Sequence, residues 1–69
     1  MAQAKITVNG EAREAELPAT IEAFLVSLGL RPKSVVVEHN GDAVAPSEFA
    51  GRMVREGDRL EVARVVAGG

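Results

Sequence analysis

The residues with the clearest chemical potential are the two glycines that end the sequence, Gly68 and Gly69. Because glycine has no Cβ, this pair combines wide backbone freedom with a very small cross-section. The segment can therefore present the Gly69 carboxylate on a thin tether that enters a narrow channel and meets a phosphate or another active site. The alternative is a frayed chain end, since termini are often poorly ordered. The two glycines alone do not decide between these interpretations.

The other side chains offer little material for catalysis. The only histidine, His39, precedes a predicted turn and is expected to be solvated there, not to act as a base or ligand. There is no cysteine, which excludes disulfides, thiolate metal sites and carrier chemistry on a Cys side chain. The acidic residues are scattered, and no second histidine completes a metal site. We therefore expect a carrier or substrate that is not itself an enzyme and that holds no metal.

Composition narrows the class of protein further. The 69 residues include 8 Lys and Arg against 10 Asp and Glu, and the charges are interspersed, which argues against nucleic acid as the main ligand. No apolar run approaches the roughly 18 residues of a membrane-spanning helix. The start of the chain lacks a basic region followed by an apolar one, so no secretory signal is expected. These observations predict one cytoplasmic domain, residues 1–69, with no nucleic acid or membrane partner.

The first half of the chain predicts a hairpin followed by a helix. Residues 5–8 and 11–17 flank Asn9-Gly10, a dipeptide that favours a two-residue hairpin turn. The Glu and Ala content of residues 11–17 would equally suit a helix, but the turn favours a strand. The helix has a cap, an apolar stripe and an end signal, which are Thr20, then Ile21, Phe24, Leu25 and Leu28, and finally Gly29.

The middle of the chain predicts two further strands. Residues 35–38 form a short, mostly β-branched run without helical periodicity, as expected for a central strand buried on both faces. A second turn signal, Asn40-Gly41, then returns the chain into a short strand at residues 43–45.

The last third predicts a short second helix and a final strand. The helix follows Pro46, with Ser47 as its cap and Phe49 and Met53 facing inward at positions i and i+4. The final strand covers residues 59–66. The order hairpin, helix, strand, short strand, short helix and strand predicts an α+β fold, in which the main helix packs across one face of a mixed sheet.

Four segments of the chain stand out together: residues 37–46 (VEHNGDAVAP), the helix around Phe49, residues 56–60 (EGDRL) and the ending VVAGG. With the order of elements, they resemble the ThiS/MoaD family of β-grasp, ubiquitin-like sulfur carrier proteins. The resemblance covers essentially the whole chain and is closest to the ThiS branch, which serves thiamine thiazole synthesis. Phe49 stands where the family often carries Trp, a departure that leaves its core role intact.

The resemblance implies a chemistry for the tail, residues 67–69, which is expected to be flexible. An adenylyltransferase of the ThiF/MoeB type would use ATP to adenylate the Gly69 carboxylate, and Gly68 would keep the tether thin. A persulfide enzyme would then supply sulfur, leaving a Gly69 thiocarboxylate that donates to a ThiG-type thiazole synthase. The ATP is consumed by the partner, so the chain itself needs no cofactor.

The strand before the tail predicts a partner surface. Val62, Val65 and Val66 lie on a segment with few polar residues, so some apolar area is expected to face solvent. The alternative, that they belong to the core, is stronger for Val62 than for Val65. Arg64 either orients an acidic partner groove or is a solvated strand charge. The predicted partner residues are Val62, Arg64, Val65, Val66 and Ala67.

Three other functions stay open on the sequence. The chain could carry sulfur for another product, such as molybdopterin or cysteine. It could be a ubiquitin-like modifier joined through Gly69 to lysines of other proteins. It could also be a plain β-grasp interaction domain. Sulfur carriers share tail and fold while partner choice depends on surface detail, so these residues do not identify the pathway.

Overall fold

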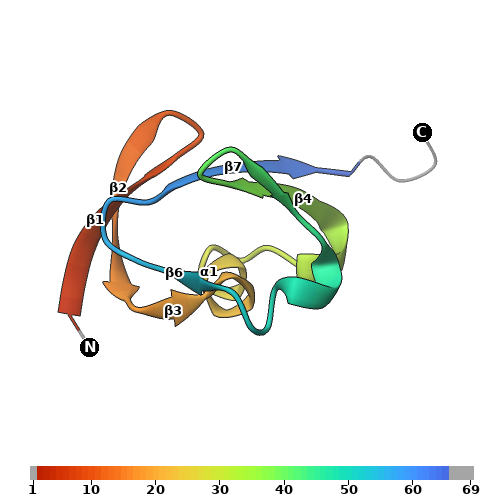
Figure 1. Ribbon diagram of the computed structural model, residues 1–69, viewed down its shortest axis with the longest axis horizontal. Coiled ribbons are helices and arrows are strands. Elements are labelled where there is room, and N and C mark those ends of the chain that lie inside the picture. The colour runs from red at the N-terminus through yellow and green to blue at the C-terminus, as the bar shows by residue number, and fades with distance from the viewer. Residues whose placement is uncertain (1, 66–69) are drawn as a thin grey trace.

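A computed structural model describes residues 2–65, and a five-stranded mixed sheet dominates it (Figure 1). The strand order is β2-β1-β7-β4-β5, and a separate two-stranded sheet pairs β3 with β6. β1 and β7 run parallel, whereas the other neighbours run antiparallel. In chain order the elements are β1 (Ala2–Val8), β2 (Glu11–Leu17), β3 (Ala19–Thr20), α1 (Ile21–Ser27), the 3₁₀ helix η1 (Pro32–Ser34), β4 (Val35–His39), β5 (Asp42–Val44), the 3₁₀ helix η2 (Pro46–Glu48), β6 (Met53–Val54) and β7 (Arg59–Arg64).

The predicted N-terminal hairpin is confirmed. β1 and β2 pair in register from Ala2 opposite Leu17 to Val8 opposite Glu11. The turn between them has positive φ at both central residues, 53° at Asn9 and 82° at Gly10. That geometry is what a type I′ turn requires, and it matches the right-handed twist of the flanking strands. Long-range pairing thus makes residues 11–17 a strand despite their helix-compatible composition.

Helix α1 begins and ends where its local signals predict. The Thr20 side-chain oxygen accepts a hydrogen bond from the backbone N–H of Ala23 at 3.0 Å, which satisfies a free donor of the first turn. At the other end Gly29 has a φ of +78°, and the N–H of Leu30 donates to the carbonyl of Leu25 at 3.0 Å. This reach across the last turn is the Schellman ending.

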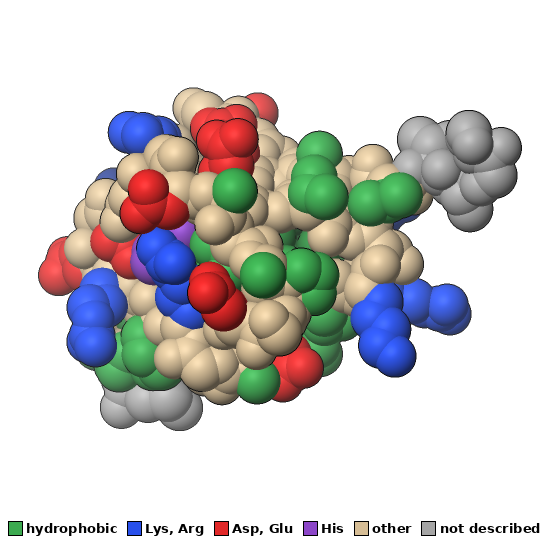
Figure 2. Space-filling model, turned by 45° about the vertical axis from the view of Figure 1, so that its right-hand side comes forward, with side chains coloured by type: hydrophobic (Ala, Val, Ile, Leu, Met, Phe, Trp, Pro, Cys, Tyr) green, Lys and Arg blue, Asp and Glu red, His purple; other side chains and the backbone are tan. Residues whose placement is uncertain are grey.

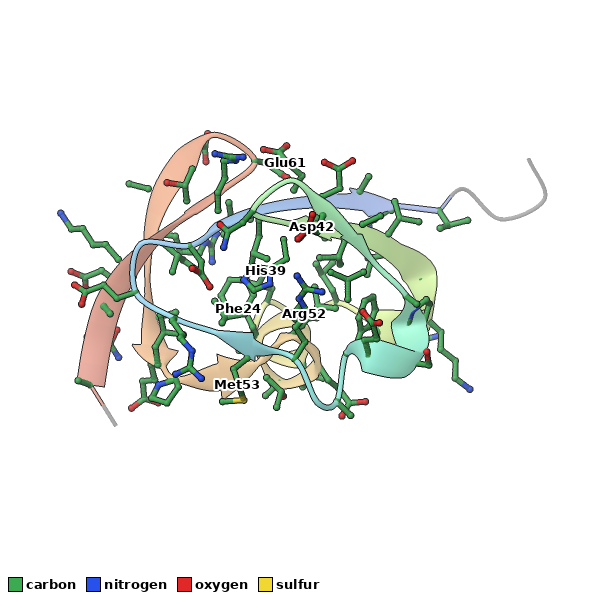
Figure 3. All side chains as sticks on the ribbon, in the orientation of Figure 1. Phe24, His39, Asp42, Arg52, Met53 and Glu61 are labelled. Atoms are coloured by element: carbon green, nitrogen blue, oxygen red, sulfur yellow. The ribbon has the colours of Figure 1, made fainter. Side chains whose placement is uncertain are left out.

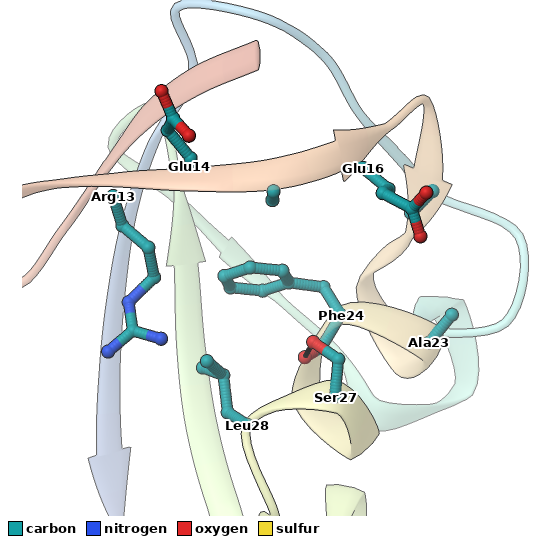
Figure 4. Close-up of a pocket in the computed structure, with 9 residues that line it drawn as sticks. Arg13, Glu14, Glu16, Ala23, Phe24, Ser27 and Leu28 are labelled. Atoms are coloured by element: carbon teal, nitrogen blue, oxygen red, sulfur yellow. Dashed lines mark hydrogen bonds between the residues drawn. The ribbon is translucent and has the colours of Figure 1, made fainter. Parts of the chain in front are cut away.

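The core lies between α1 and the face of the main sheet that it covers (Figure 1). In the close-up of Figure 4, Phe24 and Leu28 point from the helix toward β2. Helix packing on one face of a mixed sheet is the β-grasp arrangement that the element order predicts. The buried hydrophobic residues are Ile6, Leu17, Ile21, Phe24, Leu25, Val35, Val37, Val44, Phe49, Val54 and Leu60.

The prediction that residues 35–38 are buried on both faces is wrong. Burial alternates along β4, with Val35 and Val37 in the core and Val36 58% exposed. β4 does lie inside the sheet, between β7 and β5. However, α1 covers only one face of that sheet, so the other row of side chains meets solvent (Figure 1).

The predicted second helix is also wrong in its extent. η2 has three residues and no side-chain cap, and Met53 lies in β6, where it pairs with Thr20. The second helix ends early because the first N–H groups of α1 use the carbonyls of its predicted last turn. The N–H of Ile21 donates to the carbonyl of Arg52 at 2.9 Å, and the N–H of Glu22 donates to the carbonyl of Phe49 at 3.0 Å. Those carbonyls therefore satisfy the N-terminus of α1. Phe49 is 1% exposed, in agreement with its predicted inward position.

Candidate functional site

Strand β7 leads directly to the predicted tail. It lies between β1 and β4 in the sheet, and its buried residue Leu60 anchors it in the core. Past the end of the strand, the N–H of Val65 donates to the carbonyl of Ser34 at 2.8 Å, which fixes the chain up to that residue. The remaining predicted site residues, Val66, Ala67, Gly68 and Gly69, lie outside the described part of the chain.

The side chain of Asn9 forms hydrogen bonds with the backbone of β7 beyond the point where β1 ends. Its Nδ2 donates to the carbonyl of Val62 at 3.0 Å, and its Oδ1 accepts from the Val62 N–H at 2.7 Å. The amide thus replaces the pair of hydrogen bonds that a further β1 residue would make. Sequence reasoning identified Asn9 only as a turn residue, because the contact joins positions 53 apart and no local pattern signals it.

The described members of the predicted partner surface differ in exposure. Val62 is half-buried and packs against the core, so much of it is structural. Val65 is 55% exposed and Arg64 is exposed, as predicted. Both line a groove of about 350 Å³ that also involves Arg31. Apolar and basic groups thus lie together where the chain leaves the sheet, and Figure 2 shows Lys and Arg side chains gathered at this right-hand end.

The expectation that His39 is a solvated turn residue is wrong. It is 6% exposed, because the alternation of β4 places it on the core face of the strand. Figure 3 shows it between the sheet and α1, beside Arg52. The Arg52 Nε donates to Nδ1 at 2.9 Å, so the ring proton is on Nε2, which donates to a carboxylate oxygen of Asp58 at 2.7 Å. Both ring nitrogens are thus occupied, and neither is free to serve as a catalytic base.

Asp58 joins this cluster to the turn before β7. Its carboxylate also accepts from the Arg55 N–H at 2.9 Å and from the Asn40 side chain at 3.2 Å. Burial opposes ionisation of Asp58, but hydrogen bonds from the His39 side chain, the Arg55 N–H and the Asn40 side chain hold the pKa of this carboxyl below its ordinary value. The cluster ties the β4–β5 turn to the β6–β7 turn. Its role is to hold the start of β7.

Replacing Asp58 with Asn should destabilise the fold at neutral pH and do so less in acid. Loss of a carboxylate that accepts hydrogen bonds from a buried histidine costs about 1.5–3 kcal/mol. Since folding lowers the pKa of Asp58, its contribution to stability is complete above the ordinary value of 3.8 and disappears as pH falls through the lower pKa of the folded state. Urea unfolding at pH 7 and pH 3 measures the difference.

The matched control for that measurement is Asp42→Asn. Asp42 is 76% exposed and lies 3.5 Å from the Arg52 guanidinium, so its replacement should change the free energy of unfolding by less than about 1 kcal/mol. Equal losses for the two variants, or a loss for Asp58→Asn that is the same at both pH values, would show that the cluster does not stabilise the fold through the ionised carboxylate.

Residues 2–65 contain neither a candidate metal site nor a candidate membrane-spanning helix. No cluster of three or more His, Cys, Asp or Glu side chains there could hold a metal ion. No helix in the same part of the chain has the length and apolar character to cross a membrane. The expectation that the chain holds no cofactor stays a prediction.

Sequence comparison relates this chain to two curated proteins, both named thiazole synthase. The relative from Paramagnetospirillum magneticum is 38% identical over 65 residues, and the one from Magnetococcus marinus is 37% identical over 65 residues. Each match covers 94% of this chain but 20% of the relative. The chain therefore spans about one fifth of the length of these relatives.

Structural comparison agrees on the fold. A crystal structure of the thiamine biosynthesis protein ThiS from Geobacter metallireducens matches with a TM-score of 0.81 and 26% identity, over 94% of this chain and 99% of that one. A solution structure of a thiamine biosynthesis protein from the same organism gives 0.76 and 26%, over 94% and 87% of the two chains. A designed protein based on human ubiquitin matches the whole chain and 98% of its own at 0.51 and 22%, a likeness of fold alone.

The family assignment rests on nearly the full sequence. The sequence profile described as the ThiS family matches residues 6–69, from β1 to the last glycine. The topology, the Geobacter structures and this match all point the same way. The chain therefore belongs to the ThiS family.

Proposed function

We propose that this protein carries sulfur as a thiocarboxylate on Gly69 and delivers it to thiazole formation in thiamine biosynthesis. The observation that carries the proposal is the family match through Gly68 and Gly69, joined to a structure that holds the chain up to Val65. In this role the protein is a substrate of other enzymes and not an enzyme. The occupied ring nitrogens of His39 support that assignment.

The first chemical step activates the carboxylate. An oxygen of the Gly69 carboxylate attacks the α-phosphorus of ATP in an adenylyltransferase of the ThiF/MoeB type, and pyrophosphate leaves. The product is an acyl-adenylate, and AMP is a far better leaving group than the oxide of a free carboxylate. Only the backbone of Gly68 and Gly69 has to enter the enzyme, so a terminus without side chains suits the step.

The second step exchanges oxygen for sulfur. The outer sulfur of a persulfide on a donor enzyme attacks the acyl carbon and displaces AMP. A thiol then cleaves the remaining S–S bond, which leaves the thiocarboxylate on Gly69 and a disulfide on the thiol partners. The sulfur of a thiocarboxylate is more polarizable than a carboxylate oxygen, so it can attack a carbonyl or imine of the thiazole precursor.

The proposed acceptor enzyme is a thiazole synthase of the ThiG type. The support is that two chains named thiazole synthase include a segment similar to 94% of this one. A segment joined to an enzyme in some organisms commonly meets that enzyme as a separate chain in others. We place the exchange in the cytoplasm, with neither nucleic acid nor membrane as a partner and with no bound cofactor or metal.

A genetic experiment tests the pathway. Deleting the coding sequence of residues 1–69 in its own host should abolish growth without thiamine, and the thiazole moiety should restore growth. A plasmid copy should rescue the strain, whereas a copy lacking Gly69 should not. Loss of a molybdenum enzyme activity, such as nitrate reduction, with normal thiamine-independent growth would assign the carrier to molybdopterin and overturn the thiamine assignment.

A further inference from the structure

Within residues 2–65, the last part of β7 has a neighbouring strand along one edge only. β1 pairs with the first two residues of β7, Arg59 and Leu60, and then the chain turns away (Figure 1). On the other edge, β4 pairs with β7 as far as Arg64, and the carbonyl of Ser34 accepts from the Val65 N–H at 2.8 Å. The part of β7 after Leu60 therefore depends on something other than a strand along its β1 edge.

The side chain of Asn9 takes the place of a strand on that edge. The backbone N–H of Asn9 donates to the Leu60 carbonyl at 2.9 Å. Two residues further along β7, the Asn9 Oδ1 accepts from the Val62 N–H at 2.7 Å and its Nδ2 donates to the Val62 carbonyl at 3.0 Å. A side-chain amide can do this because it carries both an acceptor and a donor, as the backbone does. Asn9 therefore continues the hydrogen bonding of the β1 edge toward the C-terminal end of β7.

A second asparagine holds the opposite end of the same strand. Asn40 stands at the equivalent position of the other Asn-Gly turn, and Asn9 and Asn40 have the same φ of 53°. The Asn40 Oδ1 accepts from the Arg59 N–H at 2.8 Å, and its Nδ2 donates to the Asp58 carboxylate at 3.2 Å. Each asparagine thus combines a turn with two side-chain hydrogen bonds, Asn40 at the start of β7 and Asn9 near its end.

We propose that Asn9 is a positioning residue for the adenylation of Gly69. Its side-chain amide keeps the end of β7 in the sheet, so the segment that carries Gly69 starts from a fixed place at Val65. An enzyme that binds this segment then has to order only the residues beyond the sheet. Without the amide, the end of β7 must also be ordered on binding, which costs binding free energy. The inference rests on the proposed function and assigns one residue to the entry of the tail.

The test compares Asn9→Gly with Asn40→Gly in ATP–pyrophosphate exchange with the ThiF-type enzyme of the same host. Glycine keeps the positive φ of each turn, and each replacement removes two side-chain hydrogen bonds, so both variants should lose similar stability. Asn9→Gly should raise KM for the carrier about tenfold, which corresponds to about 1.4 kcal/mol, with kcat nearly unchanged. Asn40→Gly acts at the start of β7 and should leave KM close to that of the wild type.

Asn9→Asp tests the donor half of the amide. Aspartate has the same shape and also tolerates a positive φ, but its ionised carboxylate has no proton to donate to the Val62 carbonyl. It should therefore also raise KM. Because its side chain remains in place, this variant tests the hydrogen bonds even if Asn9→Gly does not fold.

Amide hydrogen exchange of the free protein gives a readout that does not involve the enzyme. Val65 is the informative amide, because it donates to Ser34 and none of the variants removes that acceptor. Asn9→Gly should speed exchange at Val65 more than Asn40→Gly does, since local opening of the strand end exposes this amide. Equal exchange rates at Val65 in the two variants would contradict the proposal.

The kinetic outcomes separate the positioning role from the carrier function. An unchanged KM for Asn9→Gly and Asn9→Asp, or equal increases for Asn9→Gly and Asn40→Gly, overturns the positioning role and leaves the carrier function standing. A lower kcat at an unchanged KM also overturns it, because the amide would then act on the chemical step and not on entry of the tail. No exchange with the wild type overturns the carrier function itself.

Discussion

Deleting Gly69 should abolish adenylation and leave the melting temperature almost unchanged. Misplacing a reacting group by roughly 1 Å can cost on the order of 100-fold in rate. The deletion moves the carboxylate back by one residue, about 3.3–3.6 Å of extended chain. Among the described residues 2–65 the buried core runs from Ile6 to Leu60, so we expect deletion of Gly69 to leave that core unchanged. ATP–pyrophosphate exchange and thermal unfolding of the same preparations measure the two effects.

Two further tail variants separate position from shape. Appending one residue after Gly69 puts an amide where the carboxylate should be and should be as damaging as the deletion. Gly68→Val should be nearly as damaging, because a β-branched side chain stiffens and widens the tether. Gly68→Ala adds a single methyl group and serves as the milder control. Exchange at the wild-type rate by the chain lacking Gly69 would contradict the role assigned to this carboxylate.

Phe24→Ala should cost about 3–5 kcal/mol of stability and largely unfold the protein. Phe24 is the largest side chain on the buried stripe of α1 and is 3% exposed between that helix and the sheet. The loss is of the same order as the whole stability expected for a domain of 69 residues. Urea unfolding followed by circular dichroism at 25 °C measures it.

The control for Phe24→Ala lies two positions along the same helix. Val26 is 60% exposed, so Val26→Ala removes no core packing and should change the free energy of unfolding by less than about 0.5 kcal/mol. Both variants introduce alanine into α1, so they differ only in whether the replaced side chain is buried or exposed. A cooperative transition for Phe24→Ala close to that of Val26→Ala would mean that the helix does not pack through this face.

The elements that sequence predicts well are those with local signals. Both Asn-Gly turns adopt positive φ, at Asn9-Gly10 and Asn40-Gly41, because few other residues tolerate that backbone. Thr20 caps α1, and Gly29 ends it with a φ of +78°. Each signal acts within a few residues, so it does not depend on how the rest of the chain folds.

The sequence predictions are wrong where contacts between residues far apart in the sequence determine the structure. The apolar neighbours of Val36 in the sequence predict that it is buried. Its side chain is exposed because α1 covers the other face of the sheet. Met53 fits a helical stripe, yet the N-terminus of α1 takes the carbonyls that this helix would need. His39 reads as a turn residue, yet Arg52 and Asp58 enclose it.

The same distinction between local signals and distant contacts applies to the candidate site. Exposure of Arg64 and Val65 was predictable, because both lie at the end of the last strand. The pairing of Glu38 with Glu61 was not, since it requires the register of β4 against β7. The alternation of apolar and charged residues at positions 36–38 was the sequence signal for the solvent-facing side of β4. The apolar run at residues 35–37 concealed that alternation.

The most direct test of the carrier function is the intact mass of the protein after activation. The chain is incubated with a ThiF-type enzyme, ATP and a persulfide sulfur source, then analysed intact and by fragmentation. Replacement of one oxygen by one sulfur is predicted, located at Gly69, dependent on ATP and absent from the chain lacking Gly69. An unchanged mass with an active enzyme would contradict the account. So would Gly69 found in cells mainly in isopeptide bonds to lysines of other proteins, which would make this chain a modifier.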